Sequence, residues 1–298
     1  MPDFLKLMDS LNDLSIKTNV LMSEYTSFKI GGKAPVMVEP GSATDVRRIL
    51  SIARKCRVPI FIMGNGSNLL VSDEGINAAV MRICGSMSGI KIHGTEVYAG
   101  SGALLSSLAK HTVEAGLSGL EWAAGIPGTV GGAIAMNAGA YGGDIGSVVT
   151  RIDTVHRGKI LAVKAAASDF GYRRSRFTPP EWIVCGALLS LKKADGMAGA
   201  KMAEYMDMRR KKQPLSYPSA GSVFKRPQGE YAGALIERAG LKGETVGGAR
   251  VSELHAGFII NIGGATSADV RTLIKKIQER VYRMSGIMLE PEIKFVGG

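Results

Sequence analysis

Hydrophobic positions along the chain occur both at helical spacing and in short apolar runs, which predicts a mixed α and β protein. Residues 44–57 place Val46, Ile49 and Leu50 on one helical face, and the apolar residues 58–63 directly after them fit a strand. A second helix is expected at 103–115, where Gly116 would end it. Further strands are expected at 36–40, 79–84, 89–93, 97–99, 148–156, 159–164 and 183–191. These elements form no regular βαβ repeat.

The last third of the chain has its own pattern of elements. Two glycines in residues 195–200 indicate a boundary, and a basic helix is expected at 201–212, ended by Gln213-Pro214. Thr266 and Asp269 resemble a capping box. The apolar stripe of the helix that follows consists of Val270, Leu273, Ile274, Ile277 and Val281. Residues 289–295 alternate like an edge strand.

Length and cysteine content restrict the class of protein. A chain of 298 residues is expected to form two or three domains. Its three cysteines are far apart and form no C-x-x-C pair, so no disulfide framework or cysteine metal site is expected. The four histidines are scattered, and no metal is predicted. The N-terminus lacks an apolar secretory segment, which together with the cysteines predicts a cytoplasmic protein.

The net charge of +11 is compatible with nucleic acid, an anionic membrane surface or small anionic ligands. The basic clusters at 173–176, 209–212 and 225–226 lie tens of residues apart and carry no interleaved aromatic residues, so nucleic-acid binding is not expected. The uncharged residues 122–143 are long enough to span a membrane, but their bulky apolar residues are few. We therefore expect no membrane insertion. A non-enzymatic protein that binds polyanions stays open as an alternative.

Two glycine-rich segments are candidates for a phosphate-binding surface. Residues 125–143 (GIPGTVGGAIAMNAGAYGG) contain seven glycines and no charged side chain. Residues 64–71 (GNGSNLLV) follow the predicted strand 58–63. Such main chain can approach phosphates closely, and two such loops suggest a dinucleotide, although neither has the G-x-G-x-x-G spacing. Glycines that serve only turns and internal packing remain the competing interpretation.

Three further motifs make a family resemblance specific: residues 172–177 (YRRSRF), 221–227 (GSVFKRP) and 289–293 (LEPEI). Together with the two loops, and in this order, they resemble the UDP-N-acetylenolpyruvoylglucosamine reductase family. This family makes peptidoglycan precursors and has an FAD-binding fold of the vanillyl-alcohol oxidase type. The resemblance covers roughly residues 20–296. It is to the shorter form of the family, because residues 177–181 run straight into the strand at Trp182 without the insertion that carries a tyrosine.

The resemblance implies an α+β protein in which a two-subdomain FAD-binding fold is followed by a smaller α+β substrate domain. The expected parts are an N-terminal extension (1–20), an FAD-binding domain (21–195, with subdomains of about 21–78 and 79–195) and a substrate-binding domain (196–298). The last strand, 289–296, would contribute to the active site.

The implied enzyme is an FAD-dependent oxidoreductase that reduces UDP-N-acetylglucosamine enolpyruvate to UDP-N-acetylmuramate with NADPH. The implied catalytic residues are Ser222 as proton donor, with Arg173 and Glu290 stabilising the intermediate. Substrate contacts would come from Tyr172, Lys212 and Lys225. The residues implied to bind FAD are Gly64, Asn65, Gly66, Ser67, Asn68, Leu69, Gly125, Gly128, Thr129, Gly131, Gly132, Ala138 and Gly139.

Other interpretations of these residues stay open. A hydroxyl in a Gly-Ser turn such as Ser222 also commonly caps backbone. His255 is expected to be a satisfied core residue, not a catalyst. A flavin oxidase of the same fold, acting on another small molecule, is a second alternative function. We expect a monomer.

Overall fold

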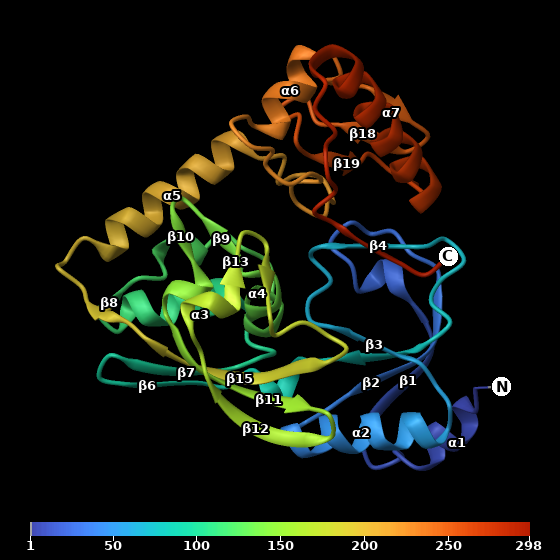
Figure 1. The fold of residues 1–298 in the computed structure, drawn as a ribbon, viewed down its shortest axis with the longest axis vertical. Coiled ribbons are helices and arrows are strands. Elements are labelled where there is room, and N and C mark those ends of the chain that lie inside the picture. The colour runs from blue at the N-terminus through green and yellow to red at the C-terminus, as the bar shows by residue number, and fades with distance from the viewer. Residues whose placement is uncertain (1) are drawn as a thin grey trace. The chain divides into compact units, whose positions relative to one another are not determined.

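The computed structural model describes residues 2–298 and forms two compact units (Figure 1). Unit 1 contains the chain up to Thr18 together with residues 35–65 and 78–208. Unit 2 contains residues 19–34, 66–77 and 209–298. The domain boundary expected at 195/196 stays a prediction.

A four-stranded sheet begins the fold. Its strand order is β1-β2-β5-β3, formed by β1 (Ser15–Leu21), β2 (Lys33–Glu39), β5 (Ala79–Arg82) and β3 (Ile60–Met63). Both β2 and β3 pair with β5 in parallel. Helix α2 (Ala43–Lys55) connects β2 to β3, and the Ser42 hydroxyl caps its N-terminus by accepting from Asp45 N at 3.1 Å. Because Val46 and Ile49 are fully buried, the predicted apolar face of this helix is confirmed. A short helix, α1 (Phe4–Asp9), precedes the sheet.

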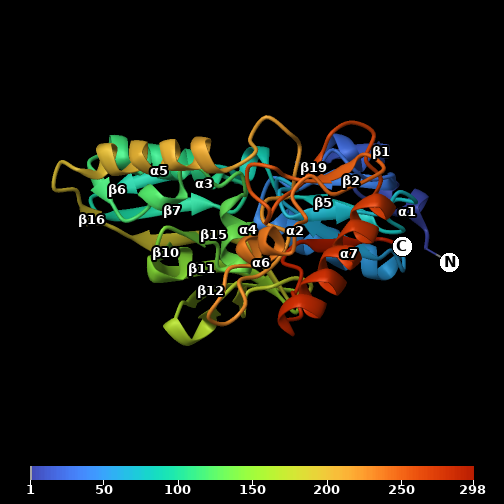
Figure 2. The same ribbon diagram turned by 90° about the horizontal axis from the view of Figure 1, so that it is seen from above.

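The second sheet of unit 1 is antiparallel and has five strands. Its strands are β6 (Ile90–His93), β7 (Glu96–Gly100), β11 (Val149–His156), β12 (Lys159–Lys164) and β15 (Trp182–Ser190). Figure 2 shows them in the order β6, β7, β15, β11, β12. Helices α3 (Leu105–Glu114) and α4 (Val130–Met136) share a core with this sheet. Its strands are close to those expected from the sequence.

Short elements complete unit 1. Two-residue strands pair as β8 (Leu117–Ser118) with β16 (Lys192–Lys193), β9 (Gly139–Ala140) with β10 (Gly143–Asp144), and β13 (Phe170–Gly171) with β14 (Arg174–Ser175). Helix α5 (Ala198–Lys212) follows and crosses from unit 1 into unit 2. The β9–β10 hairpin thus forms the end of the glycine-rich segment, and hydrogen bonds from Asn137 and Arg173 hold the β13–β14 hairpin next to it.

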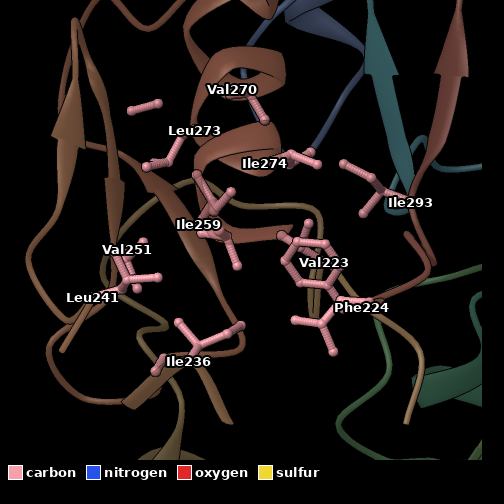
Figure 3. Packing of buried hydrophobic residues seen from close by; sticks show 14 of the residues in the cluster. Val223, Phe224, Ile236, Leu241, Val251, Ile259, Val270, Leu273, Ile274 and Ile293 are labelled. Carbon is pink, nitrogen blue, oxygen red and sulfur yellow. The ribbon is translucent and has the colours of Figure 1, made fainter. Parts of the chain in front are cut away.

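Unit 2 is built around one long helix. Its elements are β4 (Leu69–Val71), α6 (Ala232–Arg238), β17 (Thr245–Val246), β18 (Ala249–Val251), β19 (Ile259–Asn261), α7 (Ser267–Ser285) and β20 (Lys294–Val296). The capping box of α7 is confirmed, since Thr266 Oγ1 accepts from Asp269 N and the Asp269 carboxylate accepts from Thr266 N, both at 3.0 Å. All five residues of the predicted stripe are buried. Figure 3 shows Val223, Phe224 and Ile293 in one cluster with Leu273 and Ile274 of α7.

Two local predictions were wrong. Residues 289–295 do not form one edge strand: only Lys294–Val296 is a strand, and it pairs in parallel with β4. The preceding residues instead lie beside the segment around Phe224, because Phe224 forms an antiparallel bridge with Pro291. The glycine-rich segment is not all loop, because α4 lies within it. Thr129 caps that helix, and Asn137 ends it in the left-handed conformation.

Candidate active site

The two glycine-rich segments meet in unit 1. Asn65 Nδ2 donates a hydrogen bond to the Pro127 carbonyl at 2.7 Å. A Cβ on Gly64 would lie 2.2 Å from Thr129 Oγ1, closer than atoms can pack. Glycine at position 64 therefore allows the main chain of the first predicted FAD loop to lie against the Thr129 side chain of the second. The structure brings together Gly64 and Asn65 with residues 127–129.

The glycines of the second loop serve different purposes. A Cβ on Gly131 would approach Ser101 to 3.0 Å, and one on Gly139 would approach the Gly143 carbonyl to 2.6 Å, so packing within the protein explains both. Gly132 differs, because it is exposed and the nearest atom to its added Cβ would be at an ordinary 3.5 Å. The main chain of the first turn of α4 is thus open at Gly132. This opening fits the close approach that a dinucleotide phosphate requires.

The remaining residues of the predicted FAD set have clear places. Gly125 and Gly128 precede α4 in unit 1, where the Gly128 carbonyl accepts from Leu105 N at 2.9 Å. The Ala138 carbonyl accepts a hydrogen bond from Ile145 N at 3.0 Å, and Ala138 directly precedes β9. Residues 66–69 belong to unit 2, where Asn68 Nδ2 donates to the Glu292 carbonyl at 3.2 Å and Asn68 O accepts from Lys294 N at 2.9 Å. Residues 66–69 therefore also anchor the segment that follows Glu290.

Arg173 lies at the tip of the β13–β14 hairpin, next to the glycine-rich segment. Its guanidinium donates to the Gly139 carbonyl at 3.1 Å and lies 5.2 Å from the Tyr172 ring centre. Its φ of 54° is unusual for a residue that is not glycine. Such a strained backbone conformation persists only where the surrounding structure stabilises it, and these conformations are concentrated at functional sites. Tyr172 is 56% exposed beside it.

Sequence reasoning missed the residue that anchors this hairpin. Asn137 Nδ2 donates to the Gly171 carbonyl, and Asn137 Oδ1 accepts from Gly146 N, both at 3.0 Å. The side chain is 7% exposed, and it connects the arginine hairpin to the end of α4. An asparagine directly after a helical run is a signal for a left-handed helix end, so this position could have been found.

Three predicted residues, Ser222, Lys225 and Glu290, lie on adjoining segments of unit 2. The chain around Ser222 forms a bridge with Phe258, and two residues later Phe224 forms a bridge with Pro291. Lys225 N donates to the Glu290 carbonyl at 2.9 Å, and the Lys225 ammonium forms an ion pair with the Glu290 carboxylate. The Glu290 side chain is 69% exposed, so the carboxylate is open to a ligand.

Ser222 is half-buried in this arrangement. Its Oγ donates to the Phe224 carbonyl at 3.2 Å, which is a long hydrogen bond for a hydroxyl. Lys212 is the exposed last residue of α5. The structure thus places Ser222, Lys225 and Glu290 on adjoining segments of unit 2, while Arg173 and Tyr172 belong to unit 1.

The described residues offer few alternatives for chemistry. Within residues 2–298 no three His, Cys, Asp or Glu side chains are grouped so that they could hold a metal ion. The same part of the chain has no helix long and apolar enough to cross a membrane. Burial raises the pKa of the Cys185 thiol to about 12, so this cysteine is protonated at neutral pH and is not a nucleophile.

Comparisons with known proteins agree with this geometry. Residues 34–161 match the FAD binding domain family, and residues 213–296 match the C-terminal domain of UDP-N-acetylenolpyruvoylglucosamine reductase. The chain is therefore a flavoprotein of the FAD-binding oxidoreductase class, as its fold class predicted.

Full-length relatives define the family. A UDP-N-acetylenolpyruvoylglucosamine reductase from Caldanaerobacter subterraneus is 47% identical over 98% of this chain and 97% of its own. One from Pediococcus pentosaceus is 43% identical over 98% and 97%. The crystal structure of the reductase from Thermus caldophilus has a TM-score of 0.84 and 35% identity, and the match covers 95% of this chain and 100% of that one. This chain belongs to the UDP-N-acetylenolpyruvoylglucosamine reductase family, which confirms the resemblance.

Proposed function

We propose that this protein reduces UDP-N-acetylglucosamine enolpyruvate to UDP-N-acetylmuramate with NADPH, using FAD, in peptidoglycan precursor synthesis. The observation that carries the proposal is that Ser222 lies on the segment whose next residues bridge to Pro291 and form the Lys225–Glu290 ion pair. The reductase from Caldanaerobacter subterraneus matches nearly the whole length of the chain and supports this reaction.

FAD, when bound, supplies the hydride acceptor and donor that connects NADPH with the substrate. Gly64, Asn65 and residues 125–132 would hold it through main-chain groups, and the open main chain at Gly132 supports this assignment. Ala138, Gly139 and residues 66–69 complete the proposed set.

Ser222 would deliver the proton that the reaction requires. Reduction of the carbon–carbon double bond adds a hydride to one carbon and a proton to the other. A serine hydroxyl is a weak acid, so it can act only where its neighbours stabilise the alkoxide that it leaves. Water then returns the proton to Ser222.

Arg173 and Glu290 would hold and stabilise the intermediate, and the Arg173 guanidinium would offset the negative charge that develops beside the carboxylate of the substrate. The planar guanidinium of Arg173 suits a carboxylate, and the bond to the Gly139 carbonyl orients it. Glu290 accepts from Lys225, which fixes the carboxylate and offsets its charge against an anionic substrate. Tyr172, Lys212 and Lys225 would contact the substrate, with Lys225 directed to the diphosphate.

We further propose that the enzyme is a cytoplasmic monomer whose partner is this small-molecule substrate. All three cysteines are free, and Cys56 and Cys185 are buried, which agrees with a reducing compartment. The nucleotide-linked substrate points to the same compartment.

Anaerobic absorbance of the flavin bands tests the function directly. NADPH is expected to bleach the bands, and UDP-N-acetylglucosamine enolpyruvate is expected to restore them. Bleaching without recovery would reject the substrate but keep the flavin enzyme. A protein that binds no FAD after reconstitution would reject the whole assignment.

Ser222→Ala tests the proton donor, with Ser216→Ala as a control at an exposed serine in the same unit. Flavin reduction by NADPH should be unchanged in both variants. Reoxidation by substrate should slow by roughly 100- to 10,000-fold in Ser222→Ala alone, because general acid catalysis contributes that much. Equal losses in the two half-reactions would rule out this role.

A further inference from the structure

His255 occupies a slot between two glycines of unit 2. A Cβ on Gly233 of α6 would lie 3.2 Å from His255 Cε1, and one on Gly257 would lie 2.9 Å from the same atom. Neither glycine has a positive φ, so space for the ring explains both. The ring also packs edge-on against Phe258, with ring centres 5.0 Å apart and an interplanar angle of 67°. The chain thus fixes this ring from three sides.

The hydrogen bonds of His255 define its protonation state. Gly257 N donates to His255 Nδ1 at 3.1 Å, and only an unprotonated ring nitrogen can accept. Burial lowers the pKa of His255, which favours the neutral ring. The single ring proton is therefore on Nε2. The structure agrees with the expectation that His255 is satisfied, but the side chain is only half-buried.

The same turn holds Ser222. The Gly257 carbonyl accepts from Val223 N at 2.9 Å, and Phe258 forms a bridge with Ser222. Ser222 Oγ lies 3.5 Å from the point that a Gly257 Cβ would occupy, so the hydroxyl and the imidazole face the same few ångströms of main chain. On the other side, Ser252 Oγ accepts from Leu254 N and His255 N at 3.2 and 3.3 Å. A shift of residue 257 would be passed to Ser222.

We propose that His255 is a positioning residue for Ser222, acting through its Nδ1 bond to Gly257. The inference rests on the proposed proton-donor role of Ser222. His255 itself touches neither the substrate nor the cofactor in this proposal. Its neutral ring fixes the conformation of residues 252–258, and these residues fix the position of the Ser222 hydroxyl.

Two substitutions separate this role from simple filling of the slot. His255→Asn keeps an acceptor close to the position of Nδ1, whereas His255→Gln places its amide near Nε2 and loses that acceptor. Both half-reactions are measured by stopped flow on the FAD-loaded protein, with kcat and KM for the substrate. We expect unchanged flavin reduction in both variants. Reoxidation and kcat should fall roughly 10- to 100-fold in His255→Gln, the cost of a small misplacement, and stay within about 3-fold of wild type in His255→Asn.

Equal loss in both variants, or no loss in either, would overturn the proposal. Adding His255→Gln to Ser222→Ala should slow reoxidation no further, because the serine through which it acts is gone; a further 10-fold loss would also overturn it. If Ser222→Ala itself leaves reoxidation unchanged, the proposed role of Ser222 fails, and the positioning role fails with it. A measurement without variants is ¹⁵N NMR of wild type, which should show His255 protonated on Nε2 only. A Nδ1-protonated ring would contradict the inference.

Discussion

The contact between the two FAD loops makes Gly64→Ala a test of the site. The added Cβ would lie 2.2 Å from Thr129 Oγ1 and 2.9 Å from Thr129 Cγ2, and Cβ atoms do not occur this close. Thr129 is 4% exposed, and its hydroxyl accepts from Gly132 N at 3.3 Å, so it cannot rotate away without losing the cap of α4. One of the loops must move.

The structure sets the expected size of the effect. Overpacking in a well-packed region costs about 1–3 kcal/mol. Loss of a helix cap costs about 1 kcal/mol. Gly64→Ala should therefore lower the free energy of unfolding by about 1–3 kcal/mol, and it should weaken FAD binding because it disturbs the contact between the two loops.

Gly132→Ala is the matched control, because it adds the same methyl group near the same atom, Thr129 Oγ1, but without a clash. Its Cβ would be in ordinary contact at 3.5 Å, and alanine is better than glycine in a helix by about 1 kcal/mol. Its stability should therefore equal or exceed that of wild type, while FAD binding weakens because the methyl group blocks the open main chain.

Urea unfolding of the FAD-free protein and fluorescence titration with FAD measure these two quantities separately. A Gly64→Ala protein as stable as wild type would refute the packing argument. A Gly132→Ala protein with wild-type FAD affinity would refute the assignment of the first turn of α4 to the cofactor.

Three further predictions concern single side chains. The hydroxyl of Ser101 is buried and has no hydrogen-bond partner among the described residues, so Ser101→Ala should raise the free energy of unfolding by about 1 kcal/mol; a loss in urea unfolding would show that an unseen partner exists. Glu290→Gln removes a charge from an exposed site, so it should retain the FAD absorbance while turnover falls; loss of the flavin would make Glu290 structural. Because the pKa of His255 is below its ordinary 6.5 in the folded state, the unfolded state binds more protons as the pH falls from 6.5 toward the folded value. Wild type should therefore lose stability relative to His255→Asn over that window and regain it as the pH rises; parallel curves would contradict the shift.

Much of the fold could be predicted from local sequence. The Thr266–Asp269 capping box and the buried apolar stripe of α7 could be predicted because both depend only on residue spacing within one helix. The alternating segment 289–295 misled for the opposite reason: its alternation fits a strand, but bridging to the Phe224 segment leaves only three residues for β20. Pairing partners decide whether such a segment becomes a strand, and local pattern does not contain them.

The candidate site divides in the same way. The motifs identified the family and therefore Arg173, Ser222 and Glu290 as candidates, and the proposal that they act together still awaits the kinetic tests. Asn137 and His255 were not recognised as anchors. Asn137 acts through a hydrogen bond to the distant Gly171, and the His255 ring fits only because residues 233 and 257 are glycines.

The sequence by itself determined the residue types, the spacing of the helices and the motifs that mark a flavin reductase. Only the tertiary structure decided which glycines serve packing and which leave main chain open. It alone placed Lys225 beside Glu290, 65 residues away in the chain. The physical reason is that this approach is stabilised elsewhere, by burying Val223, Phe224 and Ile293 against α7. Burial of each such side chain contributes about 1.5–3 kcal/mol, whereas an exposed ion pair such as Lys225–Glu290 contributes about 0–1 kcal/mol. The apolar packing therefore keeps the two charged residues together.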